Sequence, residues 1–115
     1  MSREFVALLR ERPEIAAALR HVEIPGGAPL EVGSQAGATQ VFDGSGRMLV
    51  IIREPVLVEV PDEAERLLGV AVPSPVWWVE IQAAAGAGDA ADVAARLAEA
   101  MTGRYGGTVW NGPGR

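Results

Sequence analysis

The run Pro75–Ile81, which contains two adjacent tryptophans, is the feature that most constrains the fold. Successive side chains of a β-strand point to opposite faces of a sheet. Trp77 therefore shares a face with the aliphatic residues of the run, which predicts that it faces a core. Trp78 shares the other face with the polar Glu80 and Gln82, so we expect it at a surface. This pattern predicts a sheet with one buried face and one face available to a partner.

The remainder of the chain alternates helix signals with strand signals. Asp43-Gly44-Ser45-Gly46 between two apolar runs is typical of a β-hairpin. The expected helices are 3–11, 13–20, 63–68 and 90–102, and the expected strands are 21–24, 30–32, 39–42, 47–53, 56–60, 76–84 and 108–110. This order predicts one α+β domain over residues 1–115, with helices on one face of a mostly antiparallel sheet. A closing β–α–β unit, as in ferredoxin-like or related two-layer sandwiches, places 108–110 parallel to 76–84.

Composition excludes several kinds of active site. The chain has no cysteine, no lysine and a single histidine, so thiol nucleophiles, thiolate metal sites and Schiff-base lysines are excluded. His21 and Glu23 would share a strand face, but a metal site needs several converging ligands. Gly86–Ala91 matches a relaxed dinucleotide fingerprint, yet Asp89 puts a carboxylate where a pyrophosphate would lie, which favours an ordinary loop. We expect no catalytic residues, no metal and no cofactor.

The charge distribution favours a protein partner over a nucleic acid. The formal net charge is −5, and the arginines are spread from Arg3 to Arg115 without a basic run. Binding to phosphates needs a concentrated basic surface, whereas an acidic surface suits a basic protein. The longest dense apolar stretch, 48–52, is far shorter than a membrane span, and no signal peptide is visible. We therefore expect a cytoplasmic protein that binds another protein and no membrane.

The residues expected to bind the partner are aromatic, charged or amide side chains. Tryptophan and arginine are enriched where binding energy concentrates in interfaces. The expected set is Trp78, Glu80, Gln82, Arg104, Tyr105 and Trp110. Two alternatives stay open. One is a ferredoxin-like domain that binds or converts a small molecule in a pocket between sheet and helices. The other is a homodimer that buries the open face of the sheet.

The end of the chain carries a resemblance to a known class of proteins. The small size, the arginine-only basic composition and the segments Asp92–Met101 and Gly106–Asn111 resemble small cytoplasmic immunity proteins of bacterial polymorphic-toxin systems. The resemblance covers the C-terminal third of the chain. It implies a non-enzymatic antitoxin that occludes the active site of a toxin domain, using electrostatic steering with aromatic and arginine anchors.

Overall fold

The computed structural model describes residues 3–20, 22, 30–60, 62–85 and 89–111, and its architecture is α+β as predicted. The helices are α1 (Ile15–Leu19), α2 (Glu63–Leu68) and α3 (Ala90–Tyr105). The strands are β1 (Arg3–Leu9), β2 (Glu31–Gln35), β3 (Ala38–Phe42), β4 (Met48–Ile52), β5 (Val56–Val58), β6 (Val76–Ala83) and β7 (Gly107–Asn111). None of the helices within these ranges is long and apolar enough to cross a membrane.

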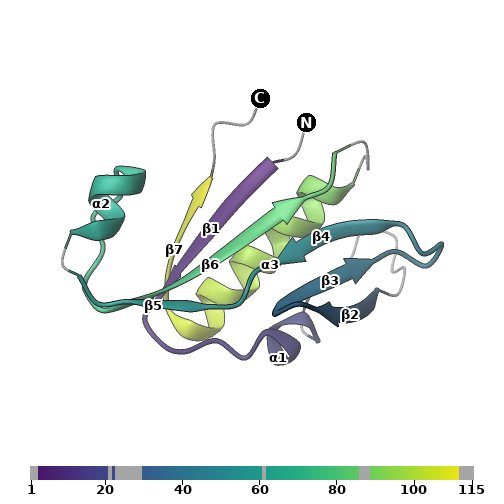
Figure 1. The fold of residues 1–115 in the computed structure, drawn as a ribbon, viewed down its shortest axis with the longest axis horizontal. Helices are drawn as coiled ribbons and strands as arrows, with labels where there is room; N and C mark the ends of the chain where they lie inside the picture. The colour runs from purple at the N-terminus through teal and green to yellow at the C-terminus, as the bar shows by residue number, and fades with distance from the viewer. Residues whose placement is uncertain (1–2, 21, 23–29, 61, 86–88, 112–115) are drawn as a thin grey trace.

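The seven strands form one open sheet with the order β2-β3-β4-β6-β1-β7, and β5 lies beside β6 (Figure 1). β6 is the central strand. It pairs with β1 along its length on one side, and with β4 and then β5 on the other. β6 and β7 are both antiparallel to β1, so they run parallel to each other with β1 between them. The closing β6–α3–β7 unit therefore has the direction predicted from the sequence.

The predicted helix at 3–11 is wrong, because this segment is strand β1. Its residues from Phe5 to Leu9 are all buried. A strand that is covered on both faces has a continuous apolar run, and Phe5, Leu8 and Leu9 in such a run also match helical spacing. The helix predicted at 13–20 forms as the shorter α1. The strand predicted at 21–24 lies outside the described residues except for Val22, which belongs to no strand.

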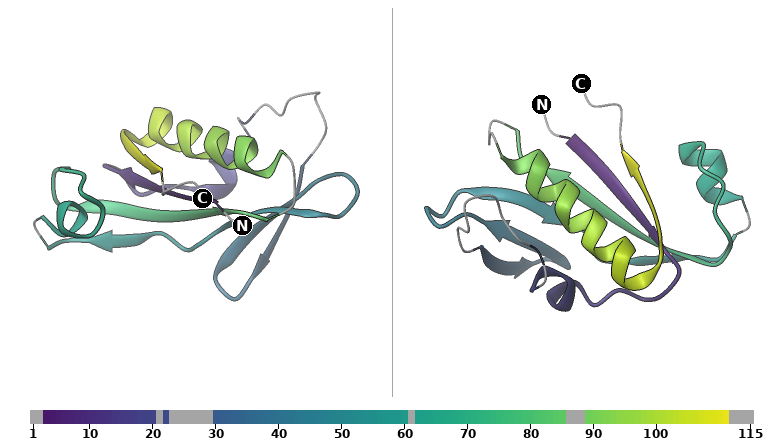
Figure 2. Two further views of the ribbon diagram at one scale, coloured as in Figure 1. Left: turned by 90° about the horizontal axis from the view of Figure 1, so that it is seen from above. Right: turned by 180° about the vertical axis from the view of Figure 1, so that it is seen from behind.

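Helices α1 and α3 cover one face of the sheet, and the larger core lies beneath them (Figure 2). Phe5, Ala7 and Leu9 of β1 point into this core, together with alternate residues of β6 and the buried side of α3. The predicted wet side of α3 is confirmed, since Asp92 and Glu99 are exposed. The helix continues through Gly103, where we expected it to end, and stops at Tyr105. A smaller cluster on the other face of the sheet includes residues of α2.

Candidate partner-binding face

We call the face of the sheet opposite α3 the second face, and the strand register fixes which residues share it. Across neighbouring strands, Thr108, Leu8, Trp78 and Val56 lie in one row. The next row contains Trp110, Val6 and Glu80. Partners directly opposite in an antiparallel ladder have adjacent side chains. Trp78 and Trp110 therefore lie on the same face of one sheet, with β1 between them.

One end of the second face is covered by the chain itself. Val6 and Leu8 are buried there, and Leu8 is only 1% exposed. Trp78 and Trp110 are half-buried against them. The cover is completed by apolar residues of α2 and of the segments on either side of it: Val58, Ala64, Leu68, Val70, Val72 and Val76. Trp78 is thus part of a second, smaller core rather than a freely exposed side chain.

The other end of the second face is open. Figure 1 looks onto it, with α3 behind the sheet, and no described helix or strand lies in front of the part of β6 that pairs with β4. The register places Gln82 in this part, within a row of four residues. That row runs from Glu4 through Gln82 and Ile51 to Gln40. Glu4 is exposed, and the other three are half-buried. We call these residues, together with the half-buried Glu80 of the adjoining row, the open face.

Four of the six residues expected to bind a partner are brought together on the second face, namely Trp78, Glu80, Gln82 and Trp110. Arg104 and Tyr105 lie at the end of α3, on the opposite side of the sheet. The Tyr105 hydroxyl accepts a hydrogen bond from the Glu14 backbone N–H (2.9 Å) and donates one to the Glu14 carbonyl (3.2 Å). Tyr105 is buried, so it joins α3 to the start of α1 instead of presenting its ring to a partner.

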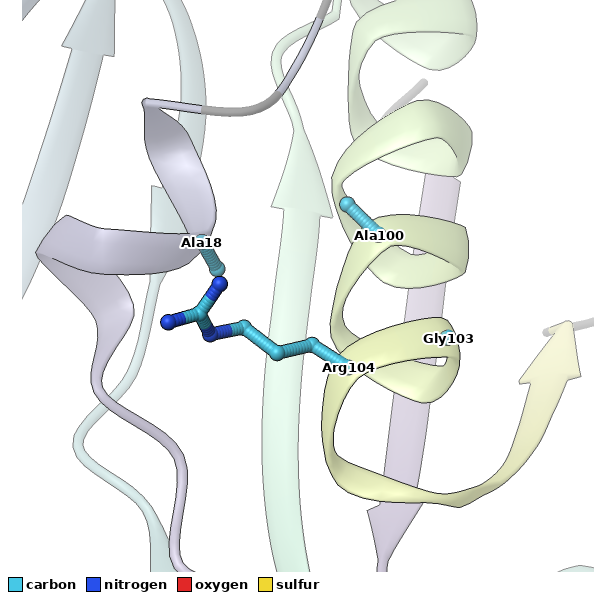
Figure 3. A pocket seen from close by; sticks show the side chains of 4 residues that line it. All are labelled: Ala18, Ala100, Gly103 and Arg104. Atoms are coloured by element: carbon cyan, nitrogen blue, oxygen red, sulfur yellow. The ribbon is translucent and has the colours of Figure 1, made fainter.

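Two cavities lie outside the open face. The first, about 340 Å³, lies between α1 and α3, and in Figure 3 the Arg104 side chain reaches across it toward Ala18. The second, about 250 Å³, lies beside Leu8, Thr108 and the segment 70–73, and Arg10 lines it. Each described lining has one charged side chain, an arginine. A guanidinium group carries a positive charge and donates hydrogen bonds, so either arginine can attract an anion.

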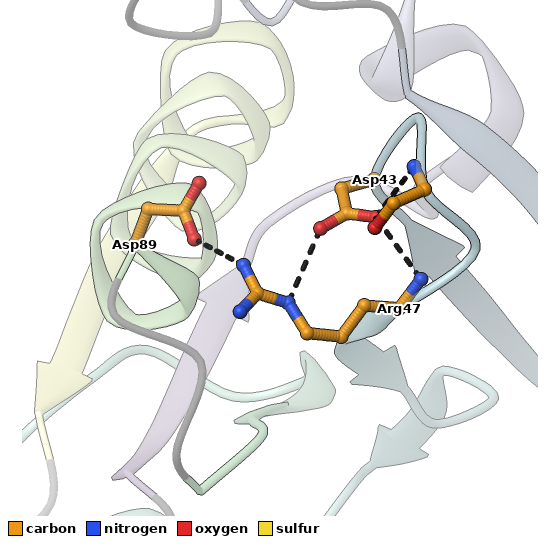
Figure 4. A network of polar contacts seen from close by, with 4 residues as sticks. Asp43, Arg47 and Asp89 are labelled. Atoms are coloured by element: carbon orange, nitrogen blue, oxygen red, sulfur yellow. Dashed lines mark hydrogen bonds and ion pairs between the residues drawn. The ribbon is translucent and has the colours of Figure 1, made fainter.

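The predicted hairpin turn is confirmed and is held by Asp43 (Figure 4). The Asp43 carboxylate accepts hydrogen bonds from the Ser45 hydroxyl (2.6 Å) and from the backbone N–H groups of Ser45 (2.9 Å) and Arg47 (3.0 Å). These bonds, led by that of the Ser45 hydroxyl, lower the pKa of Asp43. Arg47 also contacts Asp89 at 3.4 Å. Asp89 directly precedes α3, and its side chain makes no capping hydrogen bond.

Two motifs that the sequence raised fall largely outside the described residues. His21 and Glu23 are outside, and so are residues 86–88 of the dinucleotide-like segment. Within the described ranges, no group of three or more histidines or carboxylates is placed to hold a metal ion. No protein-family model, curated protein or solved structure matches the chain. Functional inference for this chain therefore rests on its own geometry and charge.

Proposed function

We propose that this protein is a non-enzymatic interaction domain whose open face binds a basic protein. The observation that carries the proposal is the division of the second face into a covered end and an open end. Ile51 lies half-buried on the open end, beside Gln82 and in a sheet with Glu80. An apolar side chain surrounded by polar and charged neighbours is a composition found in protein–protein interfaces. Trp78 and Trp110 border this surface and pack against Val6 and Leu8 of β1.

Charge supports a basic partner. Glu4 and Glu80 place two carboxylates on the open face, and neither has an ion-pair partner within 4.0 Å among the described residues. The chain as a whole carries a net charge of −5. Opposite charge on a partner raises the rate of encounter and fixes its orientation. The exposed Arg53, whose backbone N–H donates to the Glu80 carbonyl at 2.9 Å, supplies an arginine anchor at the border of this surface.

In its more specific form, the proposal is that the protein is an immunity protein. Its open face covers the active site of a basic toxin domain, so inhibition is steric and needs no chemistry from this chain. The acidic charge and the bordering tryptophans support this form. A small molecule bound beside Arg104 or Arg10, and a homodimer formed through the open face, are the competing functions.

The immunity function is tested with the gene immediately upstream in the source genome. The product of that gene should arrest growth when expressed alone, and co-expression of this chain should restore growth. Glu80→Arg should abolish the rescue, because it replaces a carboxylate of the open face with a positive charge. Glu99→Arg makes the same change of net charge on the exposed side of α3 and should leave rescue intact. A harmless upstream product, or equal rescue by both variants, contradicts the proposal.

The homodimer alternative is tested by size-exclusion chromatography with light scattering. The interaction proposal predicts a monomer at micromolar concentration. The contrary result is a tight dimer that dissociates in the Glu80→Arg variant and persists in the Glu99→Arg variant. It would show that the open face binds a second copy of the chain, which contradicts binding of a basic partner.

A further inference from the structure

Strand β5 is an edge of the sheet that no described strand covers. It pairs with β6 alone, whereas β4, which precedes it along the same side of β6, pairs with β3 as well. Residues of an antiparallel strand alternate between bonding their partner strand and directing their N–H and C=O groups to the other side. At least one residue of Val56–Val58 therefore presents both backbone groups outward. The β5 edge can accept an additional strand.

β3 does not continue along β5, because the chain turns at Ala36 and Gly37 between β2 and β3, and a bulge separates β4 from β5. Ile52 lies opposite Ile81, and Val56 lies opposite Trp78, so the register shifts by one residue between the two pairs. The chain consequently has an extra residue near Pro55, which has no N–H to donate. β3 ends its ladder with β4 at the pair Thr39–Ile52. Beyond that point the outer side of the β4–β5 segment is left without a neighbour among the described strands.

The β5 edge is also unusually apolar for an exposed segment. Five large hydrophobic residues are exposed in the described part of the chain, and four of them occur between residues 56 and 67. These four are Val56, Leu57, Val60 and Leu67. Exposed edge strands are normally protected by charged side chains or by very short length, and exposed apolar patches mark interaction sites. β5 is short, but its Val56 and Leu57 offer apolar contact area on both faces of the sheet.

The charges around β5 select the kind of partner. Five carboxylates and two guanidinium groups occur between Arg53 and Leu67. One of the two arginines, Arg66, is paired with Glu63 of α2. A second copy of this chain docked edge to edge would bring two such acidic segments together, which electrostatic repulsion opposes. A basic segment would instead meet complementary charge.

We propose that β5 is a strand-addition site for an extended segment of a partner protein in which apolar residues alternate with lysine or arginine. Main-chain hydrogen bonds to the outward groups of Val56–Val58 supply affinity, and the apolar and acidic side chains supply selectivity. This site uses the edge of the sheet and goes beyond the proposed function, which uses the open face. An experiment can therefore rule out binding at the β5 edge without ruling out binding at the open face, and the reverse.

The test uses the full chain and two fluorescent synthetic peptides, one alternating valine with lysine and arginine and one alternating valine with glutamate. Fluorescence anisotropy should show saturable binding of the basic peptide, and binding of the acidic peptide at least about tenfold weaker. Val56→Lys should weaken binding of the basic peptide by at least about tenfold, because it repels the peptide at the edge. Amide hydrogen exchange within 56–58 should slow when the basic peptide is bound.

The matched control is Val32→Lys, which adds the same charge to the edge strand β2. Val32 and Val56 are similarly exposed, at 53% and 57%. Val32→Lys should bind the basic peptide as the unmodified chain does. The proposal is overturned if the basic peptide shows no saturable binding at millimolar concentration. Equal binding by the two lysine variants, or a dimer that only Val56→Lys dissociates, also overturns it.

Discussion

Trp78 lies directly opposite Leu8 across the β1–β6 ladder, on the face of the sheet turned away from α3. Leu8 is almost fully buried although the described helix on that face, α2, is short. Its cover comes from Trp78, Trp110 and the apolar residues of α2 and the segment that follows it. The second face is consequently divided, with one end closed by the chain and the other end uncovered by the described residues.

Trp78→Ala should lower the free energy of unfolding by about 2–4 kcal/mol, because it uncovers Leu8 and removes apolar contacts from the smaller core. The value lies toward the lower end of the range for aromatic truncation since Trp78 is only half-buried. Urea unfolding measures the change. Trp78→Phe keeps most of the buried area, so it should preserve more than half of the unfolding free energy that Trp78→Ala loses. Unchanged stability of Trp78→Ala would show that the smaller core does not depend on this side chain.

Gly107→Ala should destabilise the protein by about 3 kcal/mol or more. Gly107 has a φ of +138°, and a Cβ built there would lie 1.9 Å from the Leu8 carbonyl oxygen. The control is Gly103→Ala in α3, where a Cβ meets nothing within 4 Å. That change should raise stability by about 0.5–1 kcal/mol through helix propensity. Thermal unfolding of the two variants gives both values, and equal effects of the same sign would contradict the backbone geometry at Gly107.

Tyr105→Phe should cost about 1–2 kcal/mol of unfolding free energy, because it leaves the Glu14 backbone N–H without its hydrogen-bond acceptor. Thr102→Ala serves as the control, since its hydroxyl donates to the Glu99 carbonyl in an exposed setting and its loss should matter less. Chemical denaturation separates the two. A Tyr105→Phe variant as stable as the unmodified protein would show that α1 does not depend on this contact.

The turn at Asp43 should make stability depend on pH. Its carboxyl has a lower pKa in the folded chain than its ordinary value of 3.8. The charged carboxylate therefore favours folding above that value, and this contribution is lost as the pH falls through the lower folded pKa. The stability difference between the unmodified protein and Asp43→Asn should be largest near neutral pH and should shrink in acid. An NMR titration of the Asp43 carboxyl measures the pKa directly, and a pKa at or above 3.8 contradicts the hydrogen bonding of the turn.

The strand β6 was predictable because its signal is local. Alternation of apolar and polar residues from Val79 to Ala83 assigns each side chain to a face, and Val79 and Ile81 are buried in the larger core as that alternation requires. The residues that cover each face of the strand lie outside it in the sequence, so the local pattern does not reveal them. Trp78 was placed on the correct face, but its half-buried state depends on α2 and residues 70–72, whose positions follow from tertiary contacts.

β1 shows where the periodicity of a sequence is ambiguous. Phe5, Leu8 and Leu9 have helical spacing. The segment is a strand because it pairs with β6 on one side and with β7 on the other. The same limit applies to the candidate site. Gln82 was assigned to a wet face from its neighbours in sequence, whereas its position beside Ile51 depends on the β4–β6 register. Tyr105 looked available beside Arg104, but its contact with Glu14 joins segments far apart in the chain.

The affinity of the chain for the purified product of the upstream gene tests the central claim most directly. It should be measured by isothermal titration for Glu80→Arg and Glu99→Arg, which change the net charge equally. We expect Glu80→Arg to weaken binding by at least about tenfold, and Glu99→Arg to bind as the unmodified chain does. Equal affinities for the two variants, or a loss confined to Glu99→Arg, would contradict a partner seated on the open face.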